Sequence, residues 1–357
     1  MWLSAEQSNS SLIVDEAVML KIFRSVATGE HPEAEMTRYL TAHGFANAPA
    51  LLGEVSRIDR DGKRHALAVA QAFVRNQGDA WTWALNQANR AFDATASREA
   101  TAEARGDDIR DLHAFAAAIG RQLAGMHSVL ARPTDDPAFA PERATARDVD
   151  GWIARVEDLL TRAFDCIANR KDWESEAIEA DARALLRNRE TLVQALRRLA
   201  REGEGTPMTR IHGDFHLGQV LVASADAYII DFEGEPARPL EERRRKASPL
   251  RDVAGLLRSI DYAAAMAIDP KNLLASRVSP GRRGRLVARL RDGSEKAFVQ
   301  AYRAIAGDLS FALLDFFLAE KAAYEICYEA ANRPTWMAVP VSGLARIAER
   351  LLQRSAP

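Results

Sequence analysis

The sequence predicts an α+β protein with two lobes, a small one rich in strands and a larger one that is mostly helical. Short apolar runs separated by turn residues fill the first part of the chain, and long segments with helical periodicity fill the rest. One pair of short strands interrupts the helical part. We place the lobe boundary near residue 75, so that residues 1–75 form the small lobe and residues 76–357 the large one.

Four strands and one helix are expected in the small lobe. The strands are expected over 10–14, 18–23, 50–58 and 65–73. Asp15-Glu16 separates the first two strands and Asp61-Gly62 the last two, as turn residues do in hairpins. The helix is expected to begin near Pro32, because proline suits the first turn, and to end near residue 43.

Eight segments with helical periodicity follow. The helices are expected over 81–95, 111–129, 149–169, 173–201, 249–268, 282–305, 309–332 and 341–352. Three prolines indicate a loop over 132–143, and two short strands are expected at 209–212 and 227–232.

Composition excludes several classes of protein. Lys and Arg (48) nearly balance Asp and Glu (50), so the net charge of −2 gives no reason to expect nucleic acid or a membrane surface as partner. No stretch approaches the roughly 18 apolar residues of a membrane span, and the start lacks a signal-peptide pattern. Cys166 and Cys327 have no metal-type spacing. We expect reduced thiols in a cytoplasmic protein.

The most specific segment of the chain joins 211–219, Ile-His-Gly-Asp-Phe-His-Leu-Gly-Gln, to 229–233, Ile-Ile-Asp-Phe-Glu. Phosphoryl transfer from ATP needs a carboxylate that receives the proton of the acceptor hydroxyl, and cations that bridge the phosphates. We expect Asp214 to be that base. Gln219 and Asp231 are expected to hold Mg²⁺, because carboxylate and amide oxygens suit this hard cation.

Two other interpretations of this segment stay open. His212, Asp214 and His216 are spaced by two residues and would share one face of a strand, as ligands of a hydrolytic Zn²⁺ would. A third nitrogen or sulfur ligand is missing, however, and a magnesium nucleotide explains Asp231 better. Alternatively, His212 and Asp214 only hydrogen-bond a structural turn.

Lys21 is the one cation in the apolar strand expected over 18–23. A buried ammonium is costly unless it finds anionic partners. The ATP phosphates and a glutamate of the following helix would be such partners. We choose Glu35 as this glutamate, with Glu33 as its competitor. The alternative is a lysine on an edge strand that points to solvent.

The 211–233 segment resembles the aminoglycoside-phosphotransferase and choline-kinase branch of the protein-kinase-like superfamily, whose pattern is H-G-D-x-H-x-x-N followed by I-D-F/W. Gln219 stands where most of that branch has Asn. Together with Asp-Phe-Glu-Gly-Glu-Pro at 231–236, it resembles bacterial maltokinases, which make maltose 1-phosphate from maltose and ATP. The resemblance implies a bilobal protein-kinase-like fold and an ATP-dependent sugar kinase acting on maltose, which feeds glycogen and α-glucan synthesis from trehalose.

Other runs agree with this resemblance. The loop over the phosphates in such kinases corresponds to residues 6–11 here, Glu-Gln-Ser-Asn-Ser-Ser. The hinge that binds adenine would lie at the end of the last strand of the small lobe. The nucleotide-binding residues implied in this way are Ser8, Asn9, Ser10, Gln71 and Phe73. The basic run at 243–246 is expected to be a solvated turn rather than an anion site.

The segment 320–336 resembles the helix that binds the acceptor in sugar kinases of this group. A sugar ring needs directional polar partners and a flat apolar platform. The sugar-binding residues expected on these grounds are His216, Glu325, Tyr328, Arg333 and Trp336. Alternatively, Tyr324 and Tyr328, four residues apart, are ordinary core aromatics of a helix.

Two further functions stay open. A glucosamine kinase or another amino-sugar kinase would share every residue on the ATP side. The second open function is that of a non-catalytic pseudokinase or a truncated kinase. It is suggested by the missing Gly-rich loop and by the further subdomain that maltokinases carry before the 6–11 run. We expect either a shorter relative or a piece of a longer protein, such as a fusion with trehalose synthase, which the resemblance implies as partner.

Overall fold

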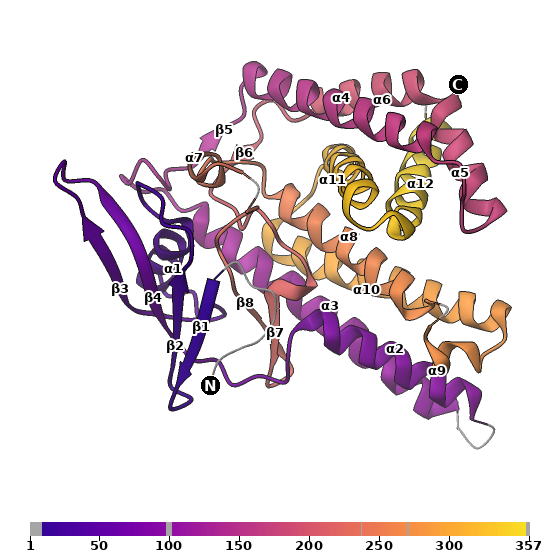
Figure 1. Ribbon diagram of the computed structural model, residues 1–357, viewed down its shortest axis with the longest axis horizontal. Helices are drawn as coiled ribbons and strands as arrows, with labels where there is room; N and C mark the ends of the chain where they lie inside the picture. Colours follow the sequence, from indigo (N-terminus) through magenta and orange to yellow (C-terminus); the bar gives the residue numbers. More distant parts are fainter. Residues whose placement is uncertain (1–8, 98–101, 237, 270, 355–357) are drawn as a thin grey trace. The chain divides into compact units, whose positions relative to one another are not determined.

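The computed structural model describes residues 9–97, 102–236, 238–269 and 271–354 (Figure 1). The chain divides into two compact units. The first comprises Met1–Pro141, Thr209–Ala247 and Met266–Gly307, and the second Glu142–Met208, Ser248–Ala265 and Asp308–Pro357. The N-terminal sheet therefore shares a unit with the segment that carries Asp214. The lobe boundary near residue 75 stays a prediction.

A four-stranded antiparallel sheet opens the first unit. Its strands are β1 (Asn9–Val14), β2 (Val18–Phe23), β3 (Leu51–Ile58) and β4 (Arg64–Ala72). They are ordered β1-β2-β4-β3. All four were expected, and each is confirmed within one residue at either end. Lys21 pairs with Ser11 of β1 and Val69 of β4. Because β2 is an interior strand, the edge-strand alternative for Lys21 is wrong.

Helix α1 (Pro32–Ala42) packs beside this sheet (Figure 1). Pro32 occupies the first turn, as expected. The apolar residues that the sheet and the helix bury together are Phe23, Ala34, Ala66 and Val69, with Leu51 packed against them. The first turn also buries two acids, Glu33 and Glu35. Such burial requires charged partners for both.

The remaining elements of the first unit are helical, apart from one hairpin. They are α2 (Ala80–Ala96), α3 (Ala102–Leu130), η1 (Leu217–Gln219), β7 (Val220–Ala223), β8 (Asp226–Ile229), α7 (Leu240–Arg243), α9 (Leu273–Ser276) and α10 (Pro280–Ala306). Helices α3 and α10 run side by side (Figure 1). A Cβ on Gly120 of α3 would lie 2.4 Å from the Phe298 carbonyl oxygen, so this approach requires glycine.

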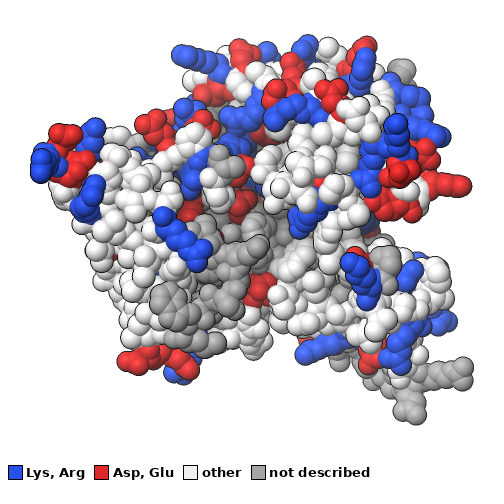
Figure 2. Space-filling model, in the orientation of Figure 1, with Lys and Arg blue, Asp and Glu red and all other residues white. Residues whose placement is uncertain are grey.

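The second unit is a helical assembly with one small ribbon. Its elements are β5 (Glu142–Arg143), α4 (Ala146–Asn169), α5 (Glu176–Arg187), α6 (Arg189–Arg201), β6 (Pro207–Met208), most of α8 (Leu250–Ala267), α11 (Phe311–Asn332), η2 (Pro334–Trp336) and α12 (Ala338–Arg354). Within the described ranges, no helix is both long and apolar enough to cross a membrane. On the face drawn in Figure 2, acidic and basic side chains are interspersed.

Two expectations about the elements were wrong, and further elements were missed. The helix expected over 173–201 is two helices, because Asn188 leaves the helical conformation and its side chain donates to the Ala184 carbonyl. The strand expected over 209–212 is not formed; only Thr209 makes a bridge, to Ala247. Strand β7, the partner of β8, was not foreseen, because its four residues are too few to show alternation.

Candidate active site

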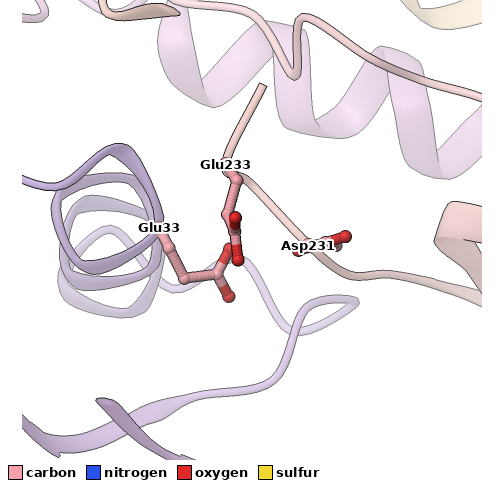
Figure 3. Close-up of side chains that lie close together, drawn as sticks. All are labelled: Glu33, Asp231 and Glu233. Carbon is pink, nitrogen blue, oxygen red and sulfur yellow. The ribbon is translucent and has the colours of Figure 1, made fainter. Parts of the chain in front are cut away.

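Three carboxylates surround the Lys21 ammonium. Its Nζ lies 2.6 Å from Glu233 Oε1 and 3.8 Å from Glu33 Oε2, and it also pairs with Asp231. One oxygen from each of the three acids lies within 4.8 Å of the others. Figure 3 shows Glu33 reaching from α1 toward the segment that carries Asp231 and Glu233. Three negative charges and one positive charge leave a local excess of two negative charges.

The charges of this cluster shift the pKa values of Lys21, Glu33 and Asp231. Burial alone would lower the pKa of Lys21, but the three carboxylates outweigh burial and raise this pKa. Burial raises the pKa of Glu33 more than Lys21 lowers it. Burial also acts to raise the pKa of Asp231, yet Lys21 outweighs it and the pKa falls. The Lys21–Asp231 pair therefore stays charged at neutral pH.

Asp231 follows β8 in an unusual backbone conformation. Its φ is +68°, in the left-handed region that non-glycine residues rarely adopt, at a cost of about 1–3 kcal/mol. This conformation is held by its contacts. Gln219 Nε2 donates to Asp231 Oδ2 at 3.0 Å, and the Ile230 amide donates to the Gln219 carbonyl at 3.0 Å. The two residues expected to hold Mg²⁺ are thus in direct contact.

His212 ties the Asp214 loop to the residue before Asp231. The imidazole is 2 % exposed, and its Nε2 lies 2.9 Å from the Ile230 carbonyl oxygen. A carbonyl only accepts, so Nε2 carries the hydrogen. Nδ1 is then the acceptor for the Asp214 amide at 3.4 Å. Because both ring nitrogens are engaged, His212 cannot ligate a metal, and the zinc-hydrolase alternative is excluded.

Asp214 presents its side chain beside an exposed histidine. The carboxylate is 24 % exposed, and its Oδ2 lies 4.0 Å from His216 Nε2. The other His216 nitrogen accepts from the Gly218 amide at 3.1 Å, which fixes the ring at the start of η1. Gly213 precedes Asp214 with φ +85°, a conformation that glycine adopts without strain. The loop thus holds an accessible carboxylate, as a base for an incoming hydroxyl requires.

The structure corrects the choice of Glu35 as the partner of Lys21. Positions 33 and 35 point to nearly opposite sides of a helix, because each residue turns the chain by about 100°. Glu33 faces Lys21, whereas Glu35 accepts from Arg210 at 2.5 Å and from Arg244 at 2.6 and 2.9 Å. The expectation of a solvated turn at 243–246 is therefore also wrong for Arg244.

The start of β1 reaches this cluster through one of its expected residues. Asn9 is buried, and its side-chain amide donates to Glu233. Ser10 instead accepts from Arg24 Nε at 3.1 Å. Ser8 lies outside the described residues. Glu233 itself was not singled out from the sequence, although it follows Asp231 by only two residues.

The two residues expected near the adenine have structural contacts. Gln71 is buried and donates to Glu33 Oε1 at 2.8 Å and to Thr37 at 3.2 Å, so its side chain holds α1. The Phe73 amide donates to the Ala17 carbonyl at 2.9 Å, just beyond the end of β4. Their roles in nucleotide binding stay predictions.

The expected sugar-binding residues other than His216 lie in the second unit, on α11, on η2 and at Arg333 between them. Glu325 is buried and accepts from Arg258 Nε at 2.8 Å. Burial raises the pKa of Glu325 more than Arg258 lowers it. Arg258 also donates to Asp261. Because this ion pair engages the carboxylate, Glu325 braces α11 against α8.

A second group in this unit combines charge with an aromatic face. Arg333 donates to Glu329 at 2.7 and 2.9 Å, and its guanidinium carbon lies 5.0 Å from the Trp336 ring centroid. Tyr262 stacks on Trp336 with a ring separation of 6.4 Å and donates to Glu329 at 3.2 Å. Tyr328 is 46 % exposed, which argues against a core aromatic. Glu329, not foreseen from the sequence, completes the group.

His31, at the start of α1, makes stability depend on pH. Its ring stacks on Phe23 at 3.8 Å, and burial, with Lys21 and Arg243 nearby, lowers its pKa from 6.5 to about 4. The unfolded chain therefore binds more protons between these values, so stability is lost as pH falls from 6.5 toward 4. The loss is about 3 kcal/mol at pH 4. We expect His31→Gln to remove most of this loss, measured as the difference in the free energy of unfolding by urea between pH 7 and pH 4.5. An unchanged difference in the variant would show that His31 is not its cause.

These observations define a phosphotransferase with a protein-kinase-like fold. Residues 3–267 match the Phosphotransferase enzyme family, and the chain belongs to this family. Among solved structures, a glucosamine kinase in complex with glucosamine, ADP and inorganic phosphate superposes with a TM-score of 0.75 at 23% identity, over 97% of this chain and 75% of that one. The predicted fold, with a small β-rich part and a larger helical part, is confirmed.

Two sequence relatives match nearly the whole chain. The chain is 28% identical over 345 residues to a glucosamine kinase of Streptacidiphilus jiangxiensis, which covers 94% of this chain and 70% of that protein. It is 27% identical over 349 residues to a glucosamine kinase of Mycolicibacterium smegmatis; the match covers 96% of this chain and 78% of that protein.

Proposed function

We propose that the protein transfers the γ-phosphate of ATP to a hydroxyl of an amino sugar, with glucosamine as the favoured acceptor. The observation that carries the proposal is the Lys21 ammonium among three carboxylates, joined through His212 to the Asp214 loop. The two relatives named glucosamine kinases support the amino sugar, which the sequence leaves open as an alternative to maltose. Maltose is the second candidate, on the 231–236 resemblance. The link to trehalose synthase and α-glucan synthesis stays a prediction.

The donor set fits Mg²⁺ as the metal of the nucleotide. Asp231, Glu233 and Gln219 offer oxygen atoms, the ligands that this hard cation prefers, and the cluster has an excess of negative charge that a divalent cation balances. When bound, Mg²⁺ would neutralise charge on the ATP phosphates. Lys21 would bind the phosphates, with Glu33 fixing its position. Asp214 would accept the proton of the acceptor hydroxyl.

We propose that the sugar binds at Glu329, Arg333 and Trp336. An indole face suits the C–H face of a sugar ring, and a guanidinium and a carboxylate supply directional polar partners. We propose that the ammonium of an amino sugar is also attracted to the Glu329 carboxylate, which is 2 % exposed and already bound by Arg333. A neutral sugar lacks this attraction.

Trp336→Ala is expected to raise the KM for glucosamine about tenfold, because the sugar loses its flat apolar platform. The KM for ATP should stay within twofold. Steady-state kinetics with each substrate varied in turn measures both constants. Arg350→Lys is the matched control, since Arg350 pairs with Asp315 at 2.8 Å elsewhere in the same unit. Equal changes in both KM values would remove Trp336 from sugar recognition.

A panel of acceptors tests the function as a whole. The full chain would be incubated with Mg-ATP and glucosamine, glucose, maltose or an aminoglycoside, with ADP release and product mass as readouts. We expect the highest kcat/KM with glucosamine. A preference for maltose would replace our proposal by a maltokinase. Binding of Mg-ATP without turnover on any acceptor would favour the non-catalytic alternative.

A further inference from the structure

The first turn of α1 is held by charged partners on two opposite sides. On one side Glu33 faces Lys21, and on the other Glu35 meets the guanidinium groups of Arg210 and Arg244. Arg244 donates twice to Glu35, at 2.6 and 2.9 Å. Although burial acts to raise the pKa of Glu35, the hydrogen bonds from Arg244 and Arg210 outweigh it and the pKa falls. This carboxylate is therefore ionised.

Arg210 is one of the most deeply buried side chains among the described residues. It is 1 % exposed, and its Nη1 lies 2.5 Å from Glu35 Oε2. Its guanidinium carbon stands 5.1 Å from the centroid of the Phe139 ring. Phe139 in turn stacks on Tyr39 of α1 at 3.7 Å, with 8° between the rings. Arg210 thus contacts α1 directly through Glu35 and indirectly through an aromatic pair.

The position of Arg210 in the chain gives this contact a consequence for the site. Arg210 precedes His212 by two residues and Asp214 by four, so it lies at the start of the loop that carries Asp214, the proposed base. Arg244 follows Glu233 by eleven residues and closes the segment that begins at Asp231. One carboxylate on α1 therefore joins both segments that line the cluster around Lys21.

Stability alone does not explain a buried ion pair at this place. Apolar residues of similar volume often stabilise a protein at least as well as a buried ion pair, because desolvation of the charges is costly. Hydrogen bonds between a guanidinium and a carboxylate add direction, however, which apolar packing lacks. Bonds from two arginines to Glu35 fix the rotation of α1 about its axis. That rotation also decides where Glu33 points.

We propose that Glu35 and Arg210 form a positioning pair, which sets α1 so that Glu33 meets Lys21 and which couples this helix to the Asp214 loop. The proposal rests on the proposed function, since that function assigns Lys21 and Asp214 their roles. The proposed function assigns neither residue of the pair a contact with substrate. The Asp214 loop is the anchor to which the pair fastens α1, and the effect of the pair on the reaction passes through Glu33.

A double-mutant cycle between positions 35 and 33 tests this route. Glu35→Gln is expected to lower kcat about 10²-fold and to raise the KM for ATP, because misplacing a substrate-orienting group by about 1 Å has an effect of that size. In a Glu33→Gln background the same change should cost less than twofold further. If the two effects multiply instead, Glu35 does not act through Glu33 and the proposal is wrong.

Two further variants guard against a loss of folding. Glu35→Asp keeps all charges but shortens the reach of the carboxylate, so it should fold and still lose about tenfold in kcat. Glu54→Gln is the matched control: Glu54 of β3 pairs with Arg38 of the same helix at 2.7 Å, away from the Asp214 loop. It should leave kcat unchanged. Equal losses in the Glu35→Asp and Glu54→Gln variants would mean that any ion pair on α1 has this effect, which overturns the proposal.

Calorimetric titration with Mg-ATP separates failure of the pair from failure of the proposed function. If the wild-type protein phosphorylates no sugar, the proposed function is refuted. The positioning pair would still be supported if Glu35→Gln weakens Mg-ATP binding in the wild-type background but not in the Glu33→Gln background. A wild-type protein that is active, with Glu35→Gln equal to it in kcat and in Mg-ATP affinity, would refute the pair alone.

Discussion

Asp214→Asn is expected to lower kcat by about 10²–10⁴-fold, with the KM for ATP within threefold of wild type. The amide has nearly the shape of the carboxylate but cannot take up the proton of the acceptor hydroxyl. The fold should be unaffected, because it is the Asp214 backbone amide that bonds His212. Steady-state kinetics with glucosamine and ATP measures the change.

Asp292→Asn is the control for this variant. Asp292 is an exposed aspartate of α10 that pairs only with its neighbour Arg291 among the contacts described. Its substitution should leave kcat unchanged. A fully active Asp214→Asn enzyme would show that Asp214 is not the base, and His216, whose Nε2 lies 4.0 Å from the same carboxylate, would become the first residue to test.

Lys21→Met is expected to lower kcat/KM for ATP by more than about 10²-fold, because a preorganised cation at the phosphates is removed. It should also lower stability, since Glu33, Asp231 and Glu233 would face one another without the ammonium between them. A divalent cation would relieve this repulsion. Mg²⁺ without nucleotide should therefore raise the Tm of the variant by several degrees more than that of wild type.

Lys63→Met serves as the control, because Lys63 lies in the exposed turn between β3 and β4. Its kinetics and its Tm with and without Mg²⁺ should match wild type. If Mg²⁺ shifts the Tm of Lys21→Met and of wild type equally, the three carboxylates do not take up the cation, and the assignment of Asp231 and Glu233 as its ligands is wrong.

Three of the residues that the sequence identified share a fixed spacing along a single segment. Asp214, Gln219 and Asp231 belong to one motif, and the structure brings Gln219 and Asp231 into contact. Lys21 was recognisable because a lone cation in an apolar strand demands anionic partners. Spacing along one segment and a lone charge in an apolar strand can both be recognised without knowledge of the tertiary structure.

The choice between Glu33 and Glu35 depended on the rotation of a helix relative to a sheet. Both acids are buried, so burial does not distinguish them, and only the packing of α1 decides which one faces Lys21. Glu233 and Glu329 were missed for a similar reason. Each has a partner far away in the sequence, Asn9 for Glu233 and Tyr262 for Glu329, although Glu329 also binds Arg333 four residues on. The break at Asn188 was hidden because the apolar periodicity continues through it.

The interior position of Lys21 limits how the site can open. Strand β2 is bonded to β1 on one side and to β4 on the other, so the Lys21 backbone cannot shift without breaking two ladders of hydrogen bonds. Asp231 and Glu233, by contrast, follow the last strand of a two-stranded hairpin. The lysine is thus the more fixed part of the proposed nucleotide site. We therefore expect any rearrangement of this cluster to move the acidic segment and to leave the Lys21 ammonium in place.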